Sequence, residues 1–185
     1  MEENGKGLLN GHEYVDLGLS VMWATCNVGA NKPEEYGDYF AWGETKTKSS
    51  YGVDNCETWE EDIDDIAGTS RDVAHVRWGS PWRMPTLKEF DELLADCDEE
   101  WTTLNGVKGR KYTSKKNGNS IFLPAAGWRF ATSLYGAGDC GIYWSSTPDG
   151  GDTQSLFYLY FDSGIHFWIW NYRYYGLSVR PVSEF

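Results

Sequence analysis

The 185-residue chain has no surplus of positive charge: 16 Lys and Arg residues stand against 28 Asp and Glu residues, for a formal net charge of −12. Nucleic acids and anionic membrane surfaces attract basic proteins, so no nucleic-acid partner is expected. The sequence also contains no apolar run near the ~20 residues of a membrane span, and direct membrane insertion is not expected. No signal peptide is visible, because the first residues lack the basic and then apolar pattern of a secretory signal.

Cysteine is scarce, and its spacing forms no motif. Cys26, Cys56, Cys97 and Cys140 follow one another at intervals of 30, 41 and 43 residues. Zinc ribbons and thioredoxin-like redox sites need CxxC pairs, and the sequence has none. The even count would permit two disulfides. Free thiols are expected instead, because no export signal is visible and a chain of this length can bury a sufficient core without cross-links.

Sequence motifs of catalysis are missing as well. His12, His75 and His166 match no catalytic or metal-ligand spacing, and there is no GxSxG elbow, phosphate-binding glycine loop or HExxH motif. The acidic run from Glu60 to Asp65 offers oxygen ligands of the kind that calcium prefers, but its spacing is not that of an EF-hand. Such a run is usually a solvated loop. No enzymatic activity, cofactor or metal is therefore expected.

Aromatic residues, by contrast, are abundant. Trp, Tyr and Phe make up 16% of the chain, and the segment GIHFWIWNYRYYG (164–176) holds six aromatic rings and a histidine in thirteen residues. Successive side chains of a strand point to opposite faces, so whichever face of this segment packs on a core, the other carries large rings. Exposed rings of this kind usually mark a binding surface. The alternative is a strand that is buried on both faces beneath N-terminal loops.

The preceding segment SLFYLYF (155–161) divides in the same way. Phe157, Leu159 and Phe161 share one face and form an ordinary core stripe. Tyr158 and Tyr160 share the other face with Asp162. Tyrosines with a polar tip suit a surface that contacts a partner.

The patterning predicts an α+β layout, with two helices ahead of strands that are concentrated near the end of the chain. A helix is predicted over 86–97, where Thr86 and Glu89 form a capping box before apolar residues spaced by three and four. A shorter helix is predicted over 70–79, with Ser70 as its N-cap.

Strands are predicted within 12–30, as a hairpin over 106–127, and repeatedly after residue 141. Residues 1–12 are expected to be disordered or to derive from an expression tag. No internal repeat or linker divides the remainder, so residues 1–185 are predicted to form a single domain.

Six blocks of the sequence, in order from about Glu13 to Val182, resemble the Fibrobacter succinogenes major paralogous domain of bacterial proteins. The blocks are YVDLGLSVMWATCNVGA, PEEYGDYFAWGE, WGSPWRMPTLKEF, IFLPAAGWR, GIYWSST and GLSVRPV. The resemblance implies a loop-rich C-type-lectin-like fold in which two helices pack on short antiparallel sheets. The same fold class includes formylglycine-generating sulfatase modifiers, sugar-binding lectins and the variable proteins of diversity-generating retroelements.

Two branches of that fold class match these residues less well than the third. Formylglycine-generating enzymes use a reactive cysteine pair in their C-terminal part, and this chain has no cysteine after Cys140. Sugar-binding lectins coordinate calcium through Glu-Pro-Asn, Gln-Pro-Asp or Trp-Asn-Asp motifs; none is present, although WNY at 170–172 approaches the last. A carbohydrate-binding domain without diversification remains the alternative function, and a relative of the formylglycine-generating enzymes is the less favoured one.

The chain resembles the variable proteins in its C-terminal part, where diversified positions are interleaved with a constant scaffold. The scaffold would be Trp144, Leu159, Phe161, Trp168, Arg173, Gly176 and Ser178 to Pro181, within a variable, ligand-displaying region 143–182. The implied ligand-binding positions are Asp152, Phe157, Tyr158, Tyr160, Asp162, Ile165, His166, Phe167, Ile169, Trp170, Asn171, Tyr172, Tyr174, Tyr175 and Leu177. All of these except Trp170 can be reached from an AAC codon by replacement of adenines.

The resemblance thus implies a non-catalytic protein that serves adhesion or receptor recognition on a bacterial cell surface or a phage tail. Its partner would be a protein or glycan ligand on another cell or surface. Tyr and Trp suit such a binding face because they supply a large contact area at a low cost in conformational entropy.

Overall fold

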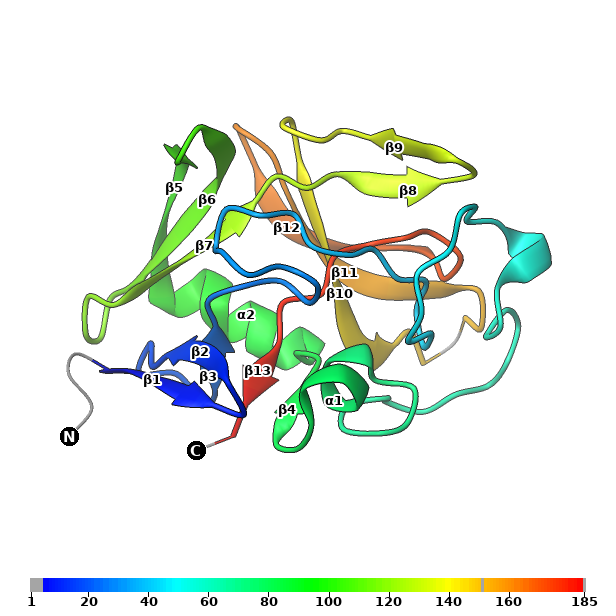
Figure 1. Ribbon diagram of the computed structural model, residues 1–185, viewed down its shortest axis with the longest axis horizontal. Coiled ribbons are helices and arrows are strands. Elements are labelled where there is room, and N and C mark those ends of the chain that lie inside the picture. Colours follow the sequence, from blue (N-terminus) through cyan, green and yellow to red (C-terminus); the bar gives the residue numbers. More distant parts are fainter. Residues whose placement is uncertain (1–4, 151, 185) are drawn as a thin grey trace.

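Antiparallel sheets and two helices make up the described part of the computed structural model, residues 5–150 and 152–184 without the side chain of Trp170 (Figure 1). The arrangement is α+β, as predicted. One sheet has the strand order β1-β2-β3-β13-β4 and so holds the last strand between two early ones. Its strands are β1 (Lys6–Leu9), β2 (His12–Val15), β3 (Met22–Ala24), β13 (Val182–Ser183) and β4 (Trp82–Arg83).

Residues 5–12, which were expected to be disordered or to derive from an expression tag, are ordered and belong to the first sheet. β1 pairs with β2 in a hairpin whose turn residues, Asn10 and Gly11, both have positive φ, as two-residue hairpin turns require. Trp82 Nε1 donates a hydrogen bond to the Leu9 carbonyl at 3.0 Å and ties this hairpin to the rest of the sheet. The Asn-Gly pair was the sequence signal for this turn.

Three further sheets complete the strand arrangement. The predicted hairpin over 106–127 is confirmed as β6 and β7, and it has an additional partner, β5, that the sequence pattern did not predict. The strands are β5 (Cys97–Leu104), β6 (Val107–Ser114) and β7 (Ser120–Pro124); β8 (Trp128–Phe130) and β9 (Ser133–Tyr135); and β10 (Gly141–Pro148), β11 (Ser155–Phe161) and β12 (His166–Tyr172). Strand β12 lies at an edge of its sheet.

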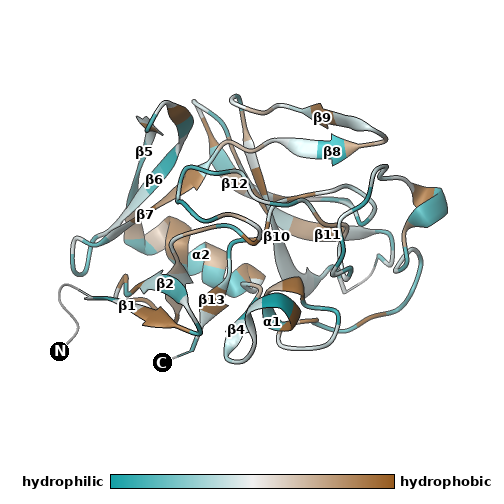
Figure 2. Ribbon diagram, viewed as in Figure 1, coloured by the Kyte–Doolittle hydropathy of each residue, from teal (hydrophilic) through white to brown (hydrophobic). Residues whose placement is uncertain are grey.

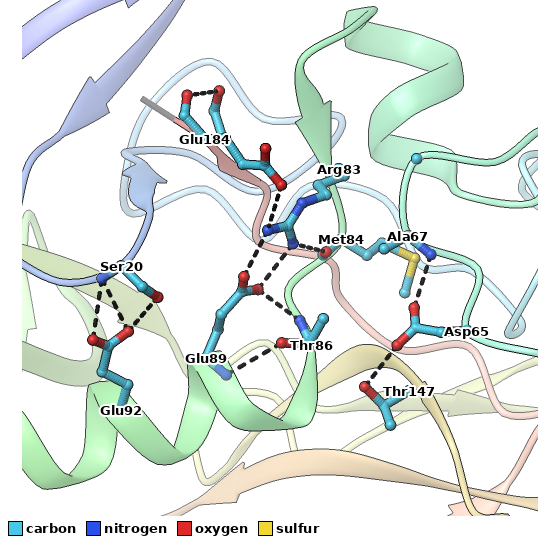
Figure 3. A network of polar contacts seen from close by, with 12 residues as sticks. Ser20, Asp65, Ala67, Arg83, Met84, Thr86, Glu89, Glu92, Thr147 and Glu184 are labelled. Atoms are coloured by element: carbon cyan, nitrogen blue, oxygen red, sulfur yellow. Dashed lines mark hydrogen bonds and ion pairs between the residues drawn. The ribbon is translucent and has the colours of Figure 1, made fainter.

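Helix α2 (Leu87–Asp96) begins at the predicted capping box. Thr86 Oγ1 accepts a hydrogen bond from the Glu89 amide at 3.3 Å, and the Glu89 carboxylate accepts one from the Thr86 amide at 2.8 Å (Figure 3). Arg83 holds the same carboxylate through an ion pair of 2.6 Å. Around the helix, apolar and polar stripes alternate (Figure 2), with Phe90 and Leu93 buried and Leu94 only half-buried.

The shorter helix, α1 (Val73–Trp78), has Asp72 as its N-cap, not Ser70 as predicted. The Asp72 carboxylate accepts hydrogen bonds from the amides of Ala74 and His75 at 2.9 and 3.1 Å, so it satisfies two amides of the first turn at once. Burial raises the pKa of Asp72, and its backbone hydrogen bonds oppose that rise. Among the residues that the structure describes, neither the length nor the apolar character of any helix suffices for a membrane crossing.

The sheet β10-β11-β12 separates two buried apolar clusters. On β11, Leu156 and Tyr158 join the cluster that contains Trp42 and Trp144, whereas Leu159 and Phe161 join the cluster beneath α2. Between β3 and α1 the chain is irregular apart from a 3-10 turn, Val53–Asn55 (η2), and it crosses in front of this sheet in Figure 1. β11 is thus a central strand with two buried faces, and β12 pairs with it along its whole length at the edge of the sheet.

Candidate ligand-binding surface

The segment that follows β12 is held in place by buried side chains. Arg173 is buried; its Nη1 donates to the carbonyls of Thr58 and Glu61 at 2.9 and 2.7 Å, and its guanidinium lies 4.9 Å from the ring centroid of Trp42. At Gly176 an added Cβ would lie 2.8 Å from the Tyr51 ring, so no larger side chain fits without displacement. The chain is therefore fixed immediately beside the rings of 172–175.

Most positions predicted as scaffold are buried. Trp144 Nε1 donates to the Phe40 carbonyl at 2.8 Å, and the Arg180 guanidinium donates to Asn27 Oδ1 at 2.9 Å and to two backbone carbonyls. Leu159 and Phe161 are buried as well, as is the whole segment from Ser178 to Pro181.

Trp168 is the exception, because 43% of its side chain is exposed. It lies opposite Leu159 in the β11–β12 register and shares its face of the sheet. β12 is an edge strand, however, and the Trp168 ring packs at 5.2 Å, edge to face, on the half-buried Phe157. The assignment of Trp168 to the buried scaffold is therefore wrong.

A cluster of five rings lies where β12 ends, and we call it the tyrosine cluster. It comprises Tyr172, Tyr174 and Tyr175 from the C-terminal segment, Trp59 from the irregular segment and Phe130 from β8. Tyr172 and Tyr174 are stacked at 5.2 Å, and Tyr174 and Tyr175 pack edge to face at 4.8 Å. Tyr172 and Phe130 are exposed and the other three are half-buried. Burial and the neighbouring Tyr175 raise the pKa of Tyr174 to about 12, so its hydroxyl stays protonated at neutral pH.

Other predicted ligand-binding residues also reach solvent. Phe167 and Ile169 are exposed on one face of β12, where the Phe167 ring lies 5.2 Å from that of Tyr160. Ile165 is exposed in the turn between β11 and β12, and Asn171 is half-buried near the end of β12. The side chain of Trp170 lies outside the described residues.

Two predicted ligand-binding residues are buried instead. Tyr158 is 6% exposed, because its face of β11 packs on the core, where its ring lies edge to face with Trp144 at 6.2 Å. Leu177 is 1% exposed and forms an isolated β-bridge with Phe40 of the irregular segment. Neither side chain is presented to a ligand in this structure.

The two predicted aspartates shape turns. Asp162 Oδ1 accepts hydrogen bonds from the amides of Gly164 and Ile165 at 2.7 and 2.9 Å, and these bonds lower the pKa of Asp162. Asp152 Oδ1 accepts from the Gln154 amide at 2.8 Å, which likewise lowers its pKa. Both carboxylates are half-buried, and both are ionised at neutral pH.

A buried arginine binds the main chain of the β11–β12 turn. Arg110 of β6 donates to the Asp162 carbonyl from Nε and Nη2 at 3.0 and 2.8 Å and to the Ile165 carbonyl at 3.2 Å, and its Nη1 pairs with Glu99. His166 stacks parallel to Tyr112 at 6.4 Å, with Nδ1 3.9 Å from Glu99. Burial and the charge of Arg110 lower the pKa of His166.

Reactive and metal-binding groups are sparse in the described chain. All four cysteines are free thiols, and burial raises the pKa of Cys97 and Cys140 to about 11. Within residues 5–150 and 152–184, no group of three or more His, Cys, Asp or Glu side chains is arranged to hold a metal ion. In the acidic run, Glu61 pairs with Arg71 at 2.8 Å and Asp65 accepts from Thr147 at 3.0 Å.

One comparison with known proteins produced a match. A family model described as a domain of unknown function (DUF8237) matches residues 93–182, which extend from the C-terminal part of α2 to the start of β13. The comparison with curated proteins and the comparison with solved structures each gave no match. The matched range contains β12, the rings of 172–175 and the buried segment that follows them.

Proposed function

We propose that this chain is a non-catalytic binding domain of C-type-lectin-like fold that presents the tyrosine cluster and the exposed rings of β12 to a protein or glycan ligand. The observation that carries the proposal is that rings which reach solvent alternate with buried residues that hold the chain in place. Tyr172, Tyr174 and Tyr175 reach solvent, while Arg173 and Gly176 between and beside them are buried. A segment that served only to complete the core would not need rings on its outer side.

The energetics of exposed rings support a binding role. A Phe, Tyr or Trp side chain buries about 150–250 Å² when it is fully enclosed, and leaving that area in water forgoes roughly 25 cal/mol per Å². Phe167, Tyr172 and Trp168 are 37%, 38% and 43% exposed, so part of this free energy is not realised in the domain as it stands. A partner that covers them would recover that free energy, and interface hot spots are rich in such residues.

The arrangement also agrees with the proposed relationship to variable proteins. The blocks that carry the sequence resemblance supply buried anchors, among them Trp42, Trp144 and Arg180. Most of the interleaved positions reach solvent, with Tyr158 and Leu177 as the exceptions. On this proposal the domain acts in adhesion or receptor recognition at a bacterial cell surface or on a phage tail.

The test compares a display variant with a matched surface variant. Fluorescent tetramers of the wild-type chain are scored on a panel of intact bacterial strains, next to a triple variant, Tyr172→Ser, Tyr174→Ser, Tyr175→Ser. The control is Leu8→Ser. Leu8 is 75% exposed, and its strand β1 lies at the opposite end of the molecule from the segment that follows β12 (Figure 1). The triple variant should lose at least tenfold in binding while the control retains it.

Thermal unfolding of the three proteins completes the test, because it separates lost binding from lost folding. Similar melting temperatures together with lost binding support the proposal. Undiminished binding of the triple variant to the bacterial strains contradicts it.

A further inference from the structure

A second candidate site lies next to the β11–β12 turn. An open groove of about 700 Å³ lies between the β5–β6 hairpin, the loop around residues 136–140 and the turn itself. These three segments meet at the upper edge of the molecule in Figure 1. The tyrosine cluster contributes none of the residues that line this groove. Its volume falls in the usual range for small-ligand sites, roughly 300–1,000 Å³.

Three aromatic rings from separate strands line the groove, and each is supported by a second ring. Trp101 of β5 packs edge to face on Phe161 at 6.4 Å, Trp128 of β8 stacks on Tyr135 at 5.6 Å, and Tyr160 of β11 packs on Phe167 at 5.2 Å. These three lining rings are half-buried, so part of each remains free. Their orientation is fixed before any ligand arrives, which reduces the entropy cost of binding.

Charged side chains also line the groove. Asp162 is held rigidly by two backbone amides, and Tyr160 donates its hydroxyl proton to Asp162 Oδ2 at 3.1 Å. Asp139 and Lys108 are exposed on the walls. At Gly138 and Gly164 a Cβ would meet nothing closer than 3.6 Å, so these positions leave the rim open. The groove therefore offers flat apolar surfaces together with strong hydrogen-bond acceptors and one cationic donor.

The combination of aromatic rings and charged groups makes the groove more suitable for some classes of ligand than for others. A purely apolar ligand would cover the carboxylates and the ammonium group without pairing them, which is costly. An anionic ligand would meet two carboxylates against one lysine in a chain of net charge −12. A pyranose ring has an apolar C–H face that can stack on an aromatic ring and hydroxyl groups at its edge that both donate and accept hydrogen bonds.

We infer that this groove binds a neutral saccharide, without a metal ion, by stacking sugar rings on Trp101, Trp128 and Tyr160 and by hydrogen bonding to Asp139, Asp162 and Lys108. The inference deepens the proposed function and rests on it only in treating the domain as a binding module. It assigns glycan recognition to a location separate from the tyrosine cluster.

The first experiment applies the wild-type chain, in buffer containing EDTA, to an array of neutral oligosaccharides of hexoses and N-acetylhexosamines. The strongest binder is then titrated while tryptophan fluorescence is recorded, because Trp101 and Trp128 lie in the groove. Saturable binding with a Kd below about 1 mM is expected. Choline chloride and sialylated oligosaccharides serve as cationic and anionic probes. Absence of neutral-glycan binding, or binding of only a charged probe, overturns the inference.

Matched variants then locate the binding site. Trp128→Ala should weaken binding of the selected oligosaccharide at least tenfold. Asp139→Asn removes one exposed charged acceptor without touching the core, and it should weaken binding about tenfold as well. Leu134→Ala on β9 is the control, because Leu134 is exposed nearby but does not line the groove. Thermal melting of each variant separates lost binding from lost folding.

The two proposals fail differently in this design. If the triple tyrosine variant still binds the oligosaccharide while Asp139→Asn does not, the groove is the glycan site. If the tyrosine variant loses the oligosaccharide and both groove variants retain it, the sugar sits on the tyrosine cluster, and the groove inference is contradicted while the proposed function stands.

Discussion

The guanidinium of Arg173 lies over the indole of Trp42, 4.9 Å from the ring centroid, and joins two segments that are far apart in the sequence. Its Nη1 also donates to the carbonyls of Thr58 and Glu61. The rings of the tyrosine cluster on either side of Arg173 are thus carried by a chain that is fixed from beneath. Exposure of those rings does not require that the segment be mobile.

Replacement of Arg173 tests this anchor. Arg173→Met keeps much of the side-chain volume but leaves two carbonyls without their charged donor. We expect a loss of about 2–4 kcal/mol in the free energy of unfolding. The control is Arg71→Met, whose partner Glu61 is also exposed, and an exposed ion pair of this kind contributes about 0–1 kcal/mol. Urea denaturation of the two variants measures the difference, and equal losses would mean that Arg173 does not hold the segment.

Phe161 and Trp168 lie on the same face of the sheet, but Phe161 is buried and Trp168 is exposed, so their replacement should have different effects on stability. Phe161→Ala should cost about 3–5 kcal/mol, because its buried ring supports the cluster beneath α2. Trp168→Ala should cost clearly less than Phe161→Ala, because Trp168 is 43% exposed and Phe157 is its ring partner in the described structure. Chemical denaturation gives both values, and a large loss for Trp168→Ala would return it to the scaffold.

The lowered pKa of His166 leads us to expect that the stability of the protein depends on pH. Its pKa is lowered in the folded protein by burial and by Arg110, and Glu99 and Tyr112 are its other close neighbours. The unfolded chain therefore binds more protons near pH 6, and stability is lost as pH falls through about 6.5. His12, stacked on Trp78, has a lowered pKa for the same reason of burial and adds to this loss.

Thermal melting between pH 7.5 and 5.5 measures the effect. His166→Gln should reduce the fall in melting temperature over this interval, and the further change His12→Gln should reduce it more. A wild-type curve that is flat over the interval, or a His166→Gln curve as steep as the wild type, contradicts this assignment.

The proposed diversification makes a prediction about DNA and about relatives. An adenine-rich near-copy of codons 143–181 should lie close to this gene, together with a gene for a reverse transcriptase. Sequenced variants should differ freely at Tyr172, Tyr174 and Tyr175. Positions 158 and 177 should keep large apolar or aromatic residues because both are buried. Free polar substitution at these two positions, with folding retained, would contradict the burial argument.

Features encoded by neighbouring residues were predictable from the sequence. The capping box of α2 depends on Thr86 and Glu89, three residues apart, and the hairpin β6–β7 on a local turn. Strand β5 was missed because residues 98–100 are acidic and exposed, so the pattern carried no apolar alternation there. Asp72 replaced Ser70 as the α1 cap because its carboxylate also accepts from the Met84 amide at 2.8 Å, which no local pattern reveals.

The candidate surface was predictable in composition but not in detail. Alternation along 155–175 indicates two faces of a strand, but it does not say which face is covered or where the cover ends. Tyr158 and Trp168 were misassigned for this reason. Trp59 and Phe130 join the tyrosine cluster from distant segments, and Trp101 and Trp128 reach the groove in the same way. Only the folded chain brings these rings together.

Arg110 fastens the β11–β12 turn through main-chain oxygens, those of Asp162 and Ile165. Every amino acid has this carbonyl group. The hydrogen bonds from Arg110 therefore do not depend on which side chain is present at position 163 or 165. Replacement of the Ser163 or Ile165 side chain is therefore expected to leave the hydrogen bonds between Arg110 and the turn in place.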